Sequence, residues 1–241
     1  MKNSFDDLWD YTDPATTETR FLDLLPQLKD PMELLELKTQ IARTHSLRKQ
    51  FEEAHRWLSE VEAVLQDTSP RVQVRYLLEK GRTWNSSGNR DAAVPCFEQA
   101  FEFADETGLQ GFAADALHML AIAQPDEAIS LNRKALEYIE LASDPAAKKW
   151  KGSLLNNLGW SLFDAGQLEG ALGVFREALQ AREEQGKSGP IRIAWWCIAR
   201  VLRELGRREE ALDIQLRLKT ELEAAGEHDP YVDEELALLQ K

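Results

Sequence analysis

The fold of this chain is most readily inferred from residues 156–179, NNLGWSLFDAGQLEGALGVFREAL. Apolar residues recur at helical spacing on both sides of DAGQ, which predicts two helices joined by a short turn. Two antiparallel helices approach closely only where their side chains are small, so we expect Gly159 and Ala171 to be the contact point within this hairpin. Larger residues around them, including Phe175, are expected to fill the space towards neighbouring hairpins. Gly166 is expected in the turn, because glycine adopts a positive φ at no steric cost.

The same spacing recurs along the chain. In four segments a small residue is followed twelve residues later by an alanine, and the pairs are Ala42 and Ala54, Gly81 and Ala93, Gly159 and Ala171, and Ala199 and Ala211. Seven residues after the small residue, three segments carry a glycine and the first carries a lysine: Gly88, Gly166, Gly206 and Lys49. Clusters of Gly and Pro divide the chain into units of about 40 residues, a period typical of helical repeat proteins. In such proteins each hairpin covers the apolar face of the one before it.

These segments resemble the tetratricopeptide repeat family. The resemblance is closest in residues 154–179, extends to residues 80–104 and 197–213, and is weaker in residues 41–65. The units are longer than the family's usual period of about 34 residues, as in kinesin light chains and some bacterial regulators. The resemblance implies an all-α, right-handed superhelix (an α-solenoid) of about five helical hairpins with capping helices.

This interpretation divides the chain into three parts. Residues 1–29 form an acidic segment with a capping helix, residues 30–226 form the solenoid, and residues 227–241 form a C-terminal capping helix with Asp229 as its N-cap. The middle repeat, residues 109–140, leaves two registers open. With Ala116 as the small residue, Asp115 takes a core position; with Ala121, which the apolar run LHMLA favours, the turn AQPDE is shortened.

Composition excludes several classes of protein. The net charge of −13 over 241 residues argues against a general binder of nucleic acid or of anionic membranes. No apolar run approaches the roughly 18 residues that a membrane helix requires, and MKNSFDDLWDYTD does not have the pattern of a signal peptide. Two cysteines do not make a disulfide scaffold. We therefore expect a cytoplasmic protein.

No catalytic constellation is recognisable. The motifs HExxH and CxxC are absent, and so is a glycine-rich phosphate loop. The four histidines, at positions 45, 55, 118 and 228, are not spaced as metal ligands on one helix. We therefore expect no enzyme activity, no metal and no cofactor.

The family resemblance implies that the first helix of each hairpin faces a concave groove. Groove positions then lie three and two residues before, and one and four residues after, each small residue. The candidate peptide-binding residues are Arg43, Arg82, Asn85, His118, Asn156, Asn157, Trp160, Trp196, Arg200 and Arg203. Arginine can bind a carboxylate through two parallel hydrogen bonds, asparagine can pair with a peptide backbone, and tryptophan is enriched at binding hot spots. The resemblance assigns a backbone contact to Asn157 in particular. Trp195 is expected to be buried.

The sequence thus predicts a non-catalytic adaptor or regulatory module that docks an acidic and hydrophobic peptide or partner protein. The alternatives are a self-associating scaffold, a small-molecule sensor and an accessory chain of an enzyme. The arginines could instead pair with glutamates of adjacent helices and bind no ligand. FDDLWDY (residues 5–11) is itself acidic and aromatic, so it either caps the solenoid or occupies the groove. The oligomeric state is left open.

Overall fold

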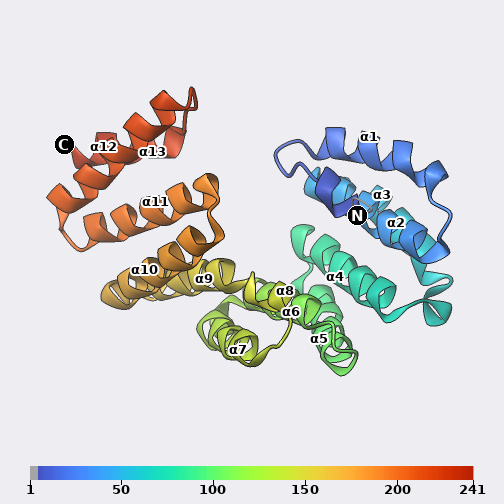
Figure 1. Cartoon of the computed structure of the whole chain (residues 1–241). Coiled ribbons are helices and arrows are strands. Elements are labelled where there is room, and N and C mark those ends of the chain that lie inside the picture. The colour runs from blue at the N-terminus through green and yellow to red at the C-terminus, as the bar shows by residue number, and fades with distance from the viewer. Residues whose placement is uncertain (1–4, 241) are drawn as a thin grey trace. The chain divides into compact units, whose positions relative to one another are not determined.

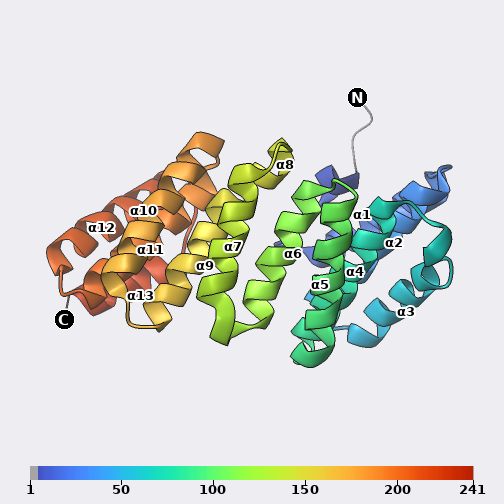
Figure 2. The same ribbon diagram turned by 90° about the horizontal axis from the view of Figure 1, so that it is seen from below.

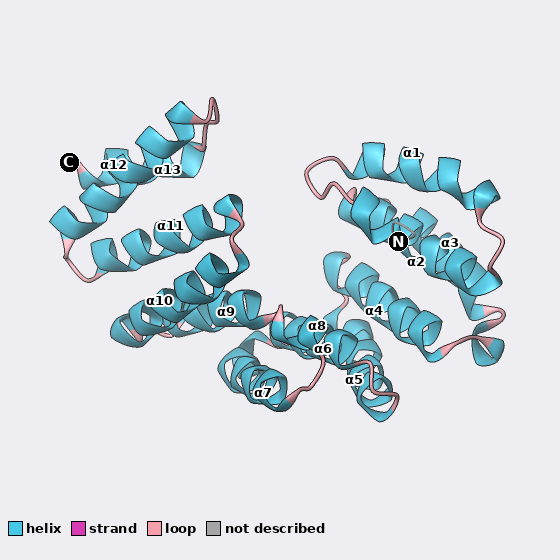
Figure 3. Cartoon of the chain, viewed as in Figure 1, coloured by secondary structure: helices cyan, strands magenta, loops and turns pink. Residues whose placement is uncertain are grey.

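The structure, a computed structural model, describes residues 5–240 and consists of helices and turns (Figures 1 and 3). No strand occurs within that range, so the prediction of an all-α protein is confirmed. The chain divides into two compact units. The N-terminal unit comprises the chain up to Pro125 together with Ala142–Ala147, and the C-terminal unit comprises Asp126–Leu141 and the chain from Lys148 onward.

The N-terminal unit contains one α-helix flanked by two short 3-10 helices, then two hairpins and one further helix. Its elements are η1 (Phe5–Leu8), α1 (Pro14–Leu24), η2 (Leu25–Gln27), α2 (Pro31–Leu47), α3 (Phe51–Glu62), η3 (Leu65–Asp67), α4 (Pro70–Ser86), α5 (Arg90–Glu106) and α6 (Gln110–Ala123). The hairpins are α2 with α3 and α4 with α5, and α1 packs against α2 as expected of a capping helix.

The C-terminal unit contains two more hairpins, α9 with α10 and α11 with α12, whose helices lie side by side in Figures 1 and 2. Its elements are α7 (Ala128–Leu141), α9 (Lys151–Asp164), α10 (Leu168–Gln185), α11 (Ser188–Glu204), α12 (Arg208–Ala224) and α13 (Pro230–Leu239). α13 packs against α12 as the expected C-terminal cap. Two short elements, η4 (Pro125–Glu127) and α8 (Pro145–Lys148), span the boundaries between the units.

Several helices begin where the sequence places an acceptor before a proline. Asp13, Asp30, Ser69 and Asp229 each accept a hydrogen bond from a backbone N–H in the first turn, and a proline follows each of them. Proline is favoured there because its missing N–H would have no intrahelical partner. The predicted N-cap at Asp229 is confirmed, since its side chain accepts from the N–H of Tyr231.

The turns inside the hairpins adopt the predicted left-handed conformation. Gly88, Gly166 and Gly206 have φ values of 88°, 73° and 78°, and Lys49, which takes the same place in the first hairpin, has φ 62°. Lys49 is the only non-glycine residue with a positive φ among residues 5–240. The four hairpins therefore share one turn geometry. Three turns use glycine, which favours a positive φ, and the first uses a lysine, which has a Cβ atom.

The close crossing within two of the hairpins depends on glycine, although not in the way the sequence suggests. A Cβ atom at Gly159 would lie 2.6 Å from Cε1 of Phe175, and one at Gly81 would lie 2.5 Å from Cε1 of Phe97. The aromatic ring of the second helix, rather than Ala171, therefore comes closest to Gly159. Phe97 and Phe175 are fully buried, because each ring fills the volume that the missing side chain leaves.

The burial of two residues on α11 bears on the sequence analysis. Cys197 is buried whereas Cys96 is partly buried, and burial raises the pKa of the Cys197 thiol to about 11. The prediction that Trp195 is buried is wrong. Its indole is only partly buried, and the Arg217 guanidinium of α12 lies 4.0 Å from the ring centre.

The middle repeat does not form a regular hairpin. α6 belongs to the N-terminal unit and α7 to the C-terminal unit, and η4 connects them instead of a glycine turn. Ala116 and Ala121 are both buried. Asp115 is buried as well, and it forms an ion pair with Arg82 of α4. An acidic residue in a core position is thus accommodated by an arginine on the neighbouring helix.

Candidate functional site

The ten predicted site residues lie on the first helices of the repeats, and all of them are partly exposed. Four belong to the N-terminal unit, on α2, α4 and α6: Arg43, Arg82, Asn85 and His118. Six belong to the C-terminal unit, on α9 and α11: Asn156, Asn157, Trp160, Trp196, Arg200 and Arg203. Within α9 the partly exposed residues face away from the buried Leu155, Leu158 and Leu162, as helical periodicity predicts.

In the N-terminal unit, internal carboxylates pair with the predicted arginines. Arg82 donates to Glu79 at 2.7 Å and also pairs with Asp115, while Nε of Arg43 lies 3.7 Å from Glu79. Burial alone would lower the pKa of Arg82, but Asp115 and Glu79 raise it, so this guanidinium stays charged. The cluster balances two arginines with two carboxylates. It therefore has little capacity for an additional acidic ligand.

His118 lies on α6 in the same unit. Burial lowers the pKa of His118, with Arg82 acting in the same direction and Asp115 in the opposite one. Because histidine has an ordinary pKa near 6.5, this imidazole is neutral at pH 7. It can thus donate or accept a hydrogen bond but does not attract an anion.

The C-terminal unit presents a continuous series of aromatic rings, which we name the aromatic row: Phe163, Trp160, Trp196 and Tyr231. The ring centres of successive members are 5.3, 6.0 and 6.2 Å apart. Trp160 also contacts the buried ring of Phe175 at 5.2 Å, and the indole N–H of Trp196 donates to the carbonyl of Tyr231 at 3.2 Å. The row is therefore held in place by Phe175 and by the Tyr231 backbone, while all four of its residues stay partly or largely exposed.

Two arginines on α11 share one carboxylate. Arg200 donates to Oε1 of Glu235 at 2.7 Å, and Nε of Arg203 donates to Oε2 at 2.8 Å. Glu235, on α13, is 1% exposed, whereas the Arg200 side chain is 34% exposed. Hydrogen bonding to Glu235 raises the pKa of Arg203, so this guanidinium is charged. Arg203 also pairs with Glu204, the next residue of α11, at 3.0 Å, so the two guanidiniums face two carboxylates. The more exposed Arg200 keeps further N–H donors for an acidic group.

A pocket of about 560 Å³ adjoins the aromatic row and shares Trp196 and Tyr231 with it. Its other apolar lining residues are Ile193, Leu218, Leu222 and Val232. Arg192 and Glu227 also line it and form an ion pair with each other. Its size and mostly apolar lining are typical of ligand pockets and leave room for apolar side chains of a bound segment.

Sequence reasoning missed Glu235, Tyr231 and the pocket. All three depend on how α13 packs against α11 and α12, and the sequence analysis assigned the C-terminal helix only a capping role. A signal was present in YVDEELALL, where Glu235 lies among the apolar residues of the amphipathic helix. A charged residue on the buried side of a helix requires a partner.

Neither a metal site nor a membrane helix was found in the part of the chain that the structure describes. No group of three or more His, Cys, Asp or Glu residues within residues 5–240 could hold a metal ion. None of the described helices has both the length and the apolar character needed to cross a bilayer.

Comparison with known proteins supports the repeat interpretation. Residues 152–184 match a family model described as tetratricopeptide repeat. The comparison with curated proteins returned no match.

Among solved structures, three illustrate the similarity of fold. The chain resembles the nearly identical tetratricopeptide-like repeats of a kinesin light chain-type protein from Podosopora anserina, with 19% identity over 80% of this chain and 96% of that one and a TM-score of 0.60. It resembles the apo form of RapI with 12% identity over 98% and 70% of the chains and a TM-score of 0.71. It resembles NprR in complex with its cognate peptide NprX with 16% identity over 98% and 71% of the chains and a TM-score of 0.55.

At these identities the structural likeness concerns the fold alone. The family match falls on the hairpin of α9 and α10, which also contains Gly159, Gly166 and Phe175. The predicted resemblance is confirmed: residues 152–184 match the tetratricopeptide repeat model, and the helical-hairpin fold resembles that of solved tetratricopeptide-like structures.

Proposed function

We propose that this chain is a non-catalytic protein-binding module of an adaptor or regulator, and that an acidic and hydrophobic segment of a partner docks on the aromatic row. A cytoplasmic setting is part of the proposal, since the two cysteines, Cys96 and Cys197, are both unpaired and suit a reducing compartment.

The observation that carries the proposal is the aromatic row beside two arginines that share Glu235. Large, rigid rings held in place by a buried core lose little entropy on binding, which is why tryptophan and tyrosine dominate interface hot spots. The partly exposed Arg200, which donates to Glu235 through one nitrogen, has further N–H groups that suit a carboxylate of the ligand. The pocket next to Trp196 and Tyr231 offers a place for an apolar side chain of the same ligand.

The other predicted residues fit this proposal to different degrees. Asn156 and Asn157 lie on α9 beside Trp160, where their amides suit a peptide backbone. Arg43, Arg82, Asn85 and His118 lie in the other unit, around carboxylates that already satisfy the arginines. We therefore assign the first docking site to the C-terminal unit. The solved complex of NprR with its peptide is a precedent for peptide binding on a similar fold.

The test uses a displayed library of random 15-residue peptides selected on the full chain. Binding of the enriched peptides is then measured on Trp160→Leu and Arg200→Glu, with Arg176→Glu, on the exposed side of α10, as a matched charge control. We expect aromatic and acidic residues in the enriched peptides, and affinity losses of about tenfold or more for the first two variants, as at hot spots. Association should slow with added salt.

Retained affinity in Trp160→Leu, or an equal loss in Arg176→Glu, would contradict the proposal. Because Trp160 packs against Phe175, thermal unfolding of each variant is measured in parallel, so that lost binding is not confused with lost folding.

A further inference from the structure

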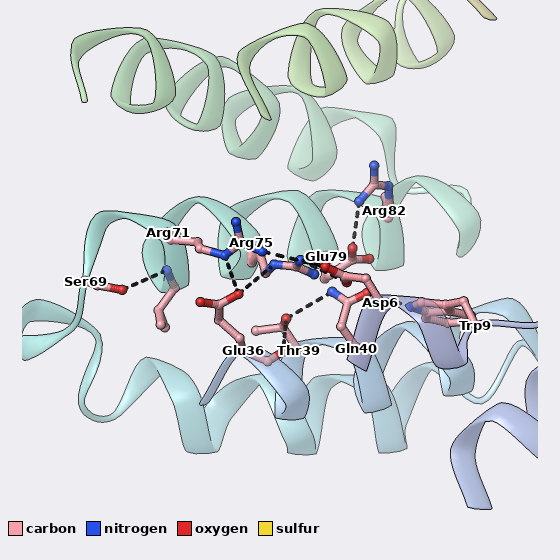
Figure 4. Close-up of polar contacts among 11 residues, drawn as sticks. Asp6, Trp9, Glu36, Thr39, Gln40, Ser69, Arg71, Arg75, Glu79 and Arg82 are labelled. Atoms are coloured by element: carbon pink, nitrogen blue, oxygen red, sulfur yellow. Dashed lines mark hydrogen bonds and ion pairs between the residues drawn. The ribbon is translucent and has the colours of Figure 1, made fainter. Parts of the chain in front are cut away.

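The N-terminal segment, residues 5–11, is held against α2 and α4 by specific polar contacts (Figure 4). Nη2 of Arg75 lies 2.9 and 2.7 Å from the two carboxylate oxygens of Asp6, and Arg71 approaches the same carboxylate at 3.6 Å. The indole N–H of Trp9 donates to the side-chain oxygen of Gln40 at 3.1 Å. The segment is thus recognised through one acid and one tryptophan.

Aromatic contacts complete the recognition. The rings of Phe5 and Trp9 both pack edge-on against Phe21 of α1, with centres 6.4 and 5.3 Å apart, and Tyr11 stacks on Trp9 at 4.7 Å. The Arg75 guanidinium lies 5.3 Å from the centre of the Phe5 ring. One arginine therefore contacts both the aromatic residue and the acid that follows it.

One residue that the segment contacts, Gln40, corresponds to a predicted ligand contact. Gln40 precedes its small residue, Ala42, by two positions, as Asn157 precedes Gly159. Gln40 is 5% exposed, whereas Asn157 is partly exposed. The same kind of surface is therefore covered in the N-terminal unit and accessible in the C-terminal unit.

The charges explain why an acid binds here. Arg71 and Arg75 both contact Glu36, with Nε–oxygen distances of 2.7 and 3.0 Å. Without Asp6, these two guanidiniums would share one carboxylate. Asp6 supplies the second negative charge. The neighbouring Asp7 is exposed and provides a matched comparison.

We propose that this surface of α2 and α4 is a second peptide site, occupied by the chain's own residues 5–11, and that a partner segment with an aromatic residue, an adjacent Asp and a nearby Trp exchanges with it. The inference concerns a different unit from the aromatic row and does not depend on the function proposed for that row. A tethered segment competes at an effective concentration in the millimolar range. A partner must therefore bind more tightly than the internal segment does, so the segment sets a threshold for docking.

The test uses a fluorescein-labelled synthetic peptide with the sequence of residues 1–13, MKNSFDDLWDYTD, and measures its binding by fluorescence polarisation. The targets are the full chain, Asp6→Asn and Asp7→Asn. We expect weak binding to the parent, binding about tenfold tighter to Asp6→Asn, because the internal segment is loosened, and no change for Asp7→Asn. A peptide carrying Asp6→Asn should bind the Asp6→Asn protein about tenfold more weakly than the unchanged peptide.

If residues 5–11 are only a cap, Asp6→Asn lowers the melting temperature and the peptide binds no target. Equal binding to Asp6→Asn and Asp7→Asn would also overturn the proposal. Trp160→Leu combined with Asp6→Asn should bind this peptide as Asp6→Asn alone does. This arm separates failure of the present inference from failure of the aromatic-row proposal.

Discussion

At the scale of single residues, Gly159 and Gly81 illustrate how a small side chain determines packing. Each faces a buried phenylalanine ring on the following helix, so that even a methyl group would approach the ring to less than 3 Å. Glycine in a helix normally costs about 1 kcal/mol relative to alanine. The protein retains glycine here because contact with the ring leaves no room for a Cβ atom.

We predict that Gly159→Ala destabilises the protein by about 1–3 kcal/mol, the usual cost of overpacking a core, despite the better helix propensity of alanine. The matched control is Gly173→Ala on the exposed side of α10, where no atom lies within 4 Å of the Cβ position. This control should stabilise the protein by about 0.5–1 kcal/mol. Urea unfolding measures both changes, and stabilisation by both substitutions would show that the ring moves aside.

The position of an arginine on its helix does not reveal whether it binds a ligand or an internal carboxylate. Helical periodicity placed Arg82, Arg200 and Arg203 on the accessible side of their helices, and all three are partly exposed. Two of their partners, Glu79 and Glu204, lie on the same helix, but Asp115 and Glu235 lie on other helices. Whether an arginine binds a ligand or an internal carboxylate thus depends on neighbours that the local pattern does not identify.

At the scale of elements, α13 does more than cover the last apolar face. It buries Val232, Leu236 and Leu239 on one side and inserts Glu235 between Arg200 and Arg203. It also brings Tyr231 to the end of the aromatic row. A helix that the sequence identified as a cap therefore shapes the candidate site.

We predict that Glu235→Gln destabilises the protein by about 2 kcal/mol, because it removes a charge-assisted interaction with two guanidiniums. Glu234→Gln, a neutralisation at the exposed neighbouring residue, should change stability by less than about 0.5 kcal/mol. Amide hydrogen exchange of residues 230–239 would show which element loosens. Unchanged exchange in α13 after Glu235→Gln would contradict the importance of this ion pair.

At the scale of the whole molecule, each helix packs mainly against helices close to it in the sequence, and the chain divides into two compact units. The division falls in the middle repeat, where η4 replaces the glycine turn and α6 and α7 belong to different units. In proteins built from repeats, stability is approximately a sum of terms within repeats and between adjacent repeats.

We therefore predict that the effect of a core substitution stays mainly within its own unit. Gly81→Ala should increase amide hydrogen exchange mostly in α2–α5, and Gly159→Ala mostly in α9–α12, because each disturbs one aromatic ring in one hairpin. Mass spectrometry of exchange across the whole chain measures both patterns. An equal increase in both units after either substitution would indicate a single cooperative unit instead.

The sequence by itself determined the helical class, the four regular hairpins, their left-handed turns and the partly exposed side of each first helix. These follow from local chemistry: the 3.6-residue period, the small residues at fixed spacing and the backbone freedom of glycine. Only the tertiary structure decided which charges meet, since Asp6 and Arg75 are 69 residues apart and Glu235 and Arg200 are 35 apart. It also decided the split of the middle repeat and the contribution of α13 to the aromatic row. Such contacts depend on the distance and register between packed helices, which a periodic pattern along one helix does not specify.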